Sequence, residues 1–203
     1  MKRYRAATGV DRFYYAPLDE TGEGITTKAP ERVEFLQNIE IEMPQEAVRA
    51  YGDNRVAEIA VASGNTSVTS AFHKVPKEDK QVLFGLEVNG GIYAYGSDDE
   101  PPYVACVFAK TYQDGSTEWV GLPKGIFLRP NITGQTKEDG VEFSSDEVTA
   151  EFMDRDIEGF DKPKSILTGT DEKGETTQRD AIFLAIFGRP FPGTETETAP
   201  AGA

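Results

Sequence analysis

The chain has very little cysteine and histidine, the residues on which nucleophilic sites and zinc sites are usually built. Among its 203 residues there is one cysteine, Cys106, and one histidine, His73. A single cysteine cannot form an intrachain disulfide, and together the two residues cannot supply three ligands to zinc. A nucleophilic site would need His73, which falls on the polar side of an expected strand, or Cys106, which falls in an apolar segment. We therefore expect no catalytic residue, no cofactor and no metal site, and we expect that the protein is not an enzyme.

Long apolar runs and an excess of positive charge are also lacking. No apolar stretch approaches the ~20 residues of a membrane-spanning helix, and the basic start of the chain leads into small residues, so we expect no signal peptide. Acidic residues outnumber basic ones by 35 to 21, which gives a formal net charge of −14. This charge repels nucleic-acid backbones and anionic lipid surfaces. We expect a protein of a reducing cytosol, without membrane association or tight nucleic-acid binding.

The composition favours short strands joined by tight turns. Hydrophobic residues make up 38% of the chain, with 20 glycines and 12 prolines. Strand-like patterns occupy 10–15, 33–43, 66–73, 103–111 and 141–153, and two short helices are expected after Pro76 and Thr177. Residues 161–175 are expected to form a polar loop. We predict a mainly β fold with one or two short helices, as a single domain over 1–193 followed by a flexible acidic tail over 194–203.

The segment 33–43 has the clearest strand pattern. Its apolar residues fall at odd positions, whereas Glu34, Glu40 and Glu42 fall at even positions, so one face of the expected strand is acidic. Two interpretations of these glutamates stay open at this point. They form either an ordinary solvated sheet face or the wall of a channel.

A turn signal follows the acidic strand. Gly52, Asp53 and Asn54 separate two strand-like segments, 47–51 and 55–62, as in a hairpin. The tip of this hairpin consists of Tyr51, Gly52, Asp53, Asn54 and Arg55. We expect the hairpin to project from the body of the protein.

Several segments share their order with a known family, although none of them is a catalytic signature. They are 9–16, 40–42, 50–53 with 57–58, 102–108, the arm that contains Trp119, 135–137 and 147–153. In this order the chain resembles the major tail proteins, or tail tube proteins, of phages with long non-contractile tails, of the kind found in phages of Gram-positive bacteria.

The resemblance implies both a fold and an assembly. The fold is a two-sheet β-sandwich with a flanking helix, and the subunits form hexameric rings that stack into a hollow tube for DNA passage. Glu34, Glu40 and Glu42 would then face the lumen, and the hairpin tip at 51–55 would connect stacked rings. The implied partners are further copies of the chain, a tape-measure protein and other tail proteins. The protein would be made in the host cytoplasm and located in the virion, and DNA would pass without specific binding.

Three alternatives differ in what they require. A monomeric β-sandwich binding module should stay monomeric and present a compact patch. Another tail component can share the fold of a tube subunit, because fold does not fix function. A carboxylate-based hydrolase, the most distant of the three, should show a cleft with two converging carboxylates.

Overall fold

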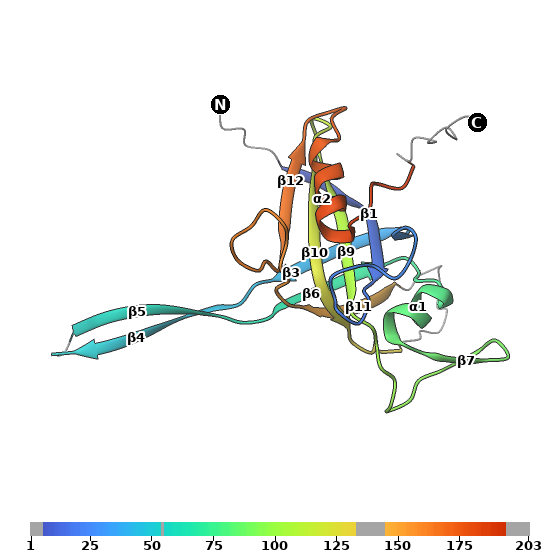
Figure 1. Ribbon diagram of the computed structural model, residues 1–203, viewed down its shortest axis with the longest axis horizontal. Coiled ribbons are helices and arrows are strands. Elements are labelled where there is room, and N and C mark those ends of the chain that lie inside the picture. The colour runs from blue at the N-terminus through green and yellow to red at the C-terminus, as the bar shows by residue number, and fades with distance from the viewer. Residues whose placement is uncertain (1–5, 54, 133–144, 194–203) are drawn as a thin grey trace, which may run out of the picture.

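The computed structural model describes residues 6–53, 55–132 and 145–193, so the expected tail at 194–203 lies outside the described residues. Figure 1 shows a β-rich body with two short helices and a long ribbon that extends away from it. The elements are, in order, β1 (Ala7–Pro17), β2 (Glu31–Val33), β3 (Leu36–Glu42), β4 (Gln45–Gly52), β5 (Arg55–Ser63), β6 (Thr66–Phe72), α1 (Lys77–Phe84), β7 (Glu87–Asn89), β8 (Ile92–Ala94), β9 (Val104–Tyr112), β10 (Thr117–Phe127), β11 (Asp146–Phe152), β12 (Leu167–Asp171) and α2 (Thr177–Phe187).

One eight-stranded antiparallel sheet forms the body. Its order is β2-β1-β9-β10-β11-β6-β3, and β12 also pairs with β10. Residues 117–121 of β10 pair with β12, whereas residues 125–127 of β10 pair with β11. The sheet therefore divides into two layers, and in Figure 1 the β3–β6 pair crosses the direction of β9, β10 and β12. The predicted fold class, mainly β with a sandwich-like arrangement and two short helices, is confirmed.

Strand β9 is the centre of this body and is buried on both faces. Val104, Cys106 and Phe108 pack between the two layers together with side chains of β6 and β11. Ala105 and Val107 point to the other side and pack beneath α2. Cys106 is part of the core, and burial raises the pKa of its thiol well above the usual value.

Helix α2 covers the outer face of the β9–β10–β12 layer. Phe183 and Ile186 are buried in the cluster that it forms with this layer. The helix is held at its N-terminus by Asp171, the last residue of β12, whose carboxylate accepts hydrogen bonds from the N–H groups of Gln178 (2.7 Å) and Arg179 (2.9 Å). An acidic group there also complements the helix dipole.

The expectation of a polar loop over 161–175 is wrong for Leu167–Asp171, because these residues form β12. This segment has too few apolar residues for a recognisable strand pattern. It becomes a strand because the first half of β10 offers it an unpaired edge, with a register from Thr117↔Asp171 to Gly121↔Leu167. No helix among the described residues is long and apolar enough to cross a membrane.

Replacing Asp171 by alanine is expected to lower the free energy of unfolding by about 1 kcal/mol, because two part-buried N–H groups at the helix N-terminus lose their acceptor. Asp171 is only 2% exposed, so water cannot easily replace the carboxylate. Urea unfolding followed by circular dichroism measures the change. Asp180→Ala, at a partly exposed acid of the same helix, is the matched control and should cost much less. Equal losses in the two variants would contradict this role of Asp171.

Candidate functional site

The β3–β6 pair continues beyond the body as a single long ribbon. Glu42 of β3 pairs with Ser67 of β6, and after a short break Gln45 of β4 pairs with Ser63 of β5. Within the break, the N–H of Gly64 donates to the carbonyl of Pro44 at 2.9 Å. In Figure 1 the β4–β5 half of this ribbon stands well away from the rest of the chain. The expectation of a projecting hairpin is therefore met, with Asn54 at its tip outside the described residues.

Three strands of the body share an outer face that is strongly acidic. Residues paired across antiparallel strands point to the same side, and the register of β3, β6 and β11 gives three rows: Asn38–Ala71–Glu147, Glu40–Thr69–Thr149 and Glu42–Ser67–Glu151. We call these nine residues the acidic face. They include four glutamates and no basic residue, and the other five are small or polar. The opposite side of β6 and β11 carries buried residues such as Val68 and Phe152.

The structure does not place the three predicted glutamates on one surface. Glu40 and Glu42 lie on the acidic face, whereas Glu34 is exposed in the link between β2 and β3 and belongs to no strand. Sequence reasoning missed Glu147 and Glu151 of β11. The signal was present, because these two glutamates alternate with the buried residues of β11, but their alignment with β3 depends on long-range strand order.

The expectation of one continuous strand over 33–43 is wrong at Phe35. This residue has a φ of +62°, so β2 ends at Val33 and β3 begins at Leu36. The side chain of Phe35 is 70% exposed, and that of Met43 is 62% exposed, although both positions fit the apolar series. Ile39 and Ile41 do pack against the core as expected. A left-handed conformation costs a non-glycine residue about 1 kcal/mol, so the structure holds Phe35 outward at some expense.

The projecting hairpin exposes apolar side chains on one of its faces. From the register, Tyr51 and Val56 share a face with Ile59 and Val61, and Arg49 lies opposite Ile59 on this face. We call the four apolar residues the apolar stripe. Tyr51 is 71% exposed and Val61 is 63% exposed. A two-stranded hairpin with no covering layer is marginally stable in water, and a row of exposed apolar residues marks a contact surface. The stripe is therefore a candidate contact surface.

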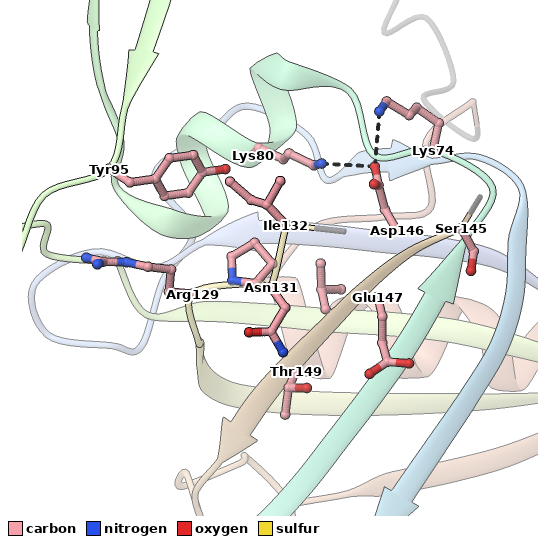
Figure 2. A pocket seen from close by; sticks show the side chains of 12 residues that line it. Lys74, Lys80, Tyr95, Arg129, Asn131, Ile132, Ser145, Asp146, Glu147 and Thr149 are labelled. Carbon is pink, nitrogen blue, oxygen red and sulfur yellow. Dashed lines mark ion pairs between the residues drawn. The ribbon is translucent and has the colours of Figure 1, made fainter. Parts of the chain in front are cut away.

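A polar cavity lies where β10 leaves β11, between α1 and the segment that follows β10 (Figure 2). Its volume is about 460 Å³. The Asp146 carboxylate at its edge accepts a hydrogen bond from the N–H of Val75 at 3.0 Å, and it pairs with Lys80 at 2.9 Å and with Lys74 at 3.7 Å. Arg129 on the other side pairs with Asp99 at 3.5 Å and donates to the carbonyl of Gly96.

The cations of this cavity thus already have anionic partners within the chain. The cluster connects α1 to the start of β11 and supports the fold at this end of the sheet. Within 6–53, 55–132 and 145–193, no group of three His, Cys, Asp or Glu residues is placed to hold a metal ion.

The acid stability of the protein should depend on Asp146. Burial raises the pKa of this carboxyl, but the hydrogen bond from Val75 and the nearby Lys80 and Lys74 outweigh burial, and the net pKa lies below its ordinary value of 3.8. A depressed folded-state pKa stabilises the protein above the unfolded-state pKa, and this stabilisation is lost as the pH falls through the folded-state pKa. We expect Asp146→Asn to be about 1 kcal/mol less stable than wild type at pH 7, with a smaller difference below pH ~4.

Urea unfolding at a series of pH values measures this effect. Glu147→Gln, at the exposed neighbouring position, is the control and should follow the wild type throughout. A gap between Asp146→Asn and wild type that stays constant from pH 7 to 3 would contradict the assignment.

Comparison with known proteins adds one finding. A family model described as phage tail tube protein matches residues 36–188, from the start of β3 to just beyond α2. The match contains the whole acidic face and the projecting hairpin. A search of curated proteins found no match to the chain.

Proposed function

The chain belongs to the phage tail tube protein family, and from this premise we propose that its copies form hexameric rings that stack into the hollow tube of a long non-contractile tail. The observation that carries this proposal is the combination of an acidic sheet face with a projecting apolar hairpin in one ribbon. A tail tube protein is a structural component of the virion. Its role in this proposal involves no catalysis.

The acidic face is the proposed wall of the channel. DNA that must slide through a tube is best served by a surface that repels phosphates and keeps its own water. Glu40, Glu42, Glu147 and Glu151 provide such a surface, and the small residues between them leave it smooth. In this proposal Glu34 lies at the border of the wall, since it stands outside the strands.

The hairpin is the proposed connection between stacked rings. The end of the hairpin at which β4 and β5 meet lies farthest from the body, and its apolar stripe needs a cover that the body does not provide (Figure 1). A neighbouring copy in the next ring would supply this cover. Pairing of the terminal strand β3 with an adjacent subunit in the same ring would likewise remove an open sheet edge.

The partners of the proposed tube are other tail proteins, including a tape-measure protein in the lumen, and DNA in transit without specific binding. Synthesis in the host cytoplasm agrees with a single buried cysteine. The exposed hairpin favours an assembling protein over a monomeric binding module, for which an uncovered apolar stripe would be a liability. Another tail component that shares this fold would also form rings but would not extend into long tubes.

Assembly state tests the proposal. The full-length protein is purified, concentrated and examined by light scattering and by negative-stain electron microscopy. Rings and tubes with a central hole are the expected result. A strictly monomeric protein, also in the presence of the other tail proteins, would overturn the assignment.

A further inference from the structure

Phe35 is presented to solvent as a fixed apolar knob. Its side chain is 70% exposed and its backbone has a φ of +62°, a conformation that suits glycine far better. The backbone N–H of His73 donates to the carbonyl of Phe35 at 3.0 Å, and the two rings make an edge-to-face contact with centroids 6.4 Å apart. The residue is thus held in place, although within the chain most of its ring surface stays uncovered. Rare backbone conformations that the surroundings maintain cluster at functional contacts.

A mainly apolar pocket of about 300 Å³ lies at the end of β10, on the side of β11 that is away from β3. Its apolar lining consists of Phe84, Leu86, Tyr95, Pro101, Phe127 and Leu128, and the ion pair of Asp99 with Arg129 completes the lining. Leu128 is 44% exposed, and its N–H donates to the carbonyl of Thr149 at the point where β10 leaves β11. The pocket shares Tyr95 and Arg129 with the polar cavity of Figure 2, beside which it opens.

The knob and the pocket lie at opposite edges of one set of strands and toward the same end. Phe35 precedes β3, the terminal strand of the sheet, whereas the pocket lies beyond β11, two strands away. Leu36 is in one row with Phe72 and Asp146, and the pocket begins near Thr149 of the same strand β11. An offset of a few residues along β11 matches the stagger between neighbouring strands in a barrel of tilted strands.

From this arrangement we propose that Phe35 of one copy inserts into the pocket of the adjacent copy in the same ring. The inference rests on the proposed tube function and identifies a contact within it. Because the two surfaces differ, the contact is head-to-tail, and repeated around an axis it closes a ring. An aromatic anchor in an apolar pocket is the usual centre of a strong interface.

Disulfide trapping tests the contact. Phe35→Cys and Leu128→Cys are combined in one chain and oxidised under assembly conditions, and Cys106, which is fully buried, stays unreactive. The expected result is a reducible ladder of covalently linked subunits. The control pairs Phe35→Cys with Leu184→Cys, which is 61% exposed on α2, and should give no ladder. In parallel, Phe35→Asp should raise the concentration needed for assembly at least tenfold. Phe35→Leu, which keeps an apolar side chain, should assemble at a concentration close to that of the wild type.

The outcomes separate this inference from the function on which it rests. If wild-type protein forms tubes but the 35/128 pair gives no ladder and Phe35→Asp assembles normally, the contact is wrong and the tube function stands. If the wild type forms no rings or tubes, the proposed function fails and the contact fails with it. Circular dichroism of each variant before assembly identifies misfolding. If Phe35→Asp is misfolded, the presence or absence of a ladder from the Phe35→Cys/Leu128→Cys variant decides whether the contact exists.

Discussion

Replacing Ile59 and Val61 together by aspartate is expected to leave the body folded and to abolish tube assembly. Both side chains belong to the apolar stripe, with 59% and 63% of their surfaces exposed, so the isolated subunit loses little packing. In a stacked tube the same side chains would be buried against a neighbouring copy. Burial of a large aliphatic side chain contributes about 1.5–3 kcal/mol, so the pair should raise the critical concentration for assembly by a factor of about 100 or more.

The matched control places aspartates on the other face of the same strand. Ala60 and Ala62 alternate with the two stripe residues on β5, so Ala60→Asp with Ala62→Asp adds the same charge to the same hairpin. Sedimentation of assembled material over a range of protein concentrations measures both variants. A stripe variant that assembles at the wild-type concentration would refute the role of the hairpin, and equal losses in both variants would show that charge alone prevents stacking.

Reversing the charge of the acidic face is expected to turn a tube that DNA passes into one that retains DNA. Glu40, Glu42, Glu147 and Glu151 are all exposed, and their replacement by lysine should not disturb the core. Each substitution adds two charges, so four of them change the net charge of a copy by eight, from −14 to −6. A basic channel would bind the phosphate backbone, and this binding would weaken steeply with added salt.

Two measurements follow the reversal. The first is the binding of a fluorescent DNA fragment to assembled tubes at 50 and 200 mM salt, and the second is DNA ejection from particles that carry the variant. The control reverses four exposed acids elsewhere, Glu20, Asp156, Glu158 and Asp161, and changes the net charge equally. Retention of DNA by the acidic-face variant but not by the control is expected. Equal behaviour of the two variants would mean that net charge, and not the position of the glutamates, governs passage.

Local patterns predicted a large part of this fold. The period-2 alternation around Glu40 and Glu42, the doubly apolar β9 and the helix that begins at Thr177 all reflect the environment of each residue and are visible in the sequence. The turn at Gly52 and Asp53 likewise predicted the hairpin, because turn chemistry is local.

The features that were missed depend on contacts between distant segments. Glu147 joins the acidic face only because β6 lies between β11 and β3, a strand order that no local pattern encodes. β12 is a strand because β10 offers it an edge, and its own residues give a mixed signal, since its two threonines favour strands whereas Gly169 and Asp171 do not. At Phe35 the apolar series continues but the backbone reverses to a positive φ, so a residue that fits the core pattern ends up exposed.

A cryo-electron microscopy map of the assembled protein tests the central claim most directly. The account predicts a hollow tube in which the side chains of Glu40, Glu42, Glu147 and Glu151 face the central channel, while α2 lies on the opposite side of the subunit and the β4–β5 hairpin contacts a copy in the neighbouring ring. A tube in which α2 lines the channel and the acidic face points outward would contradict it.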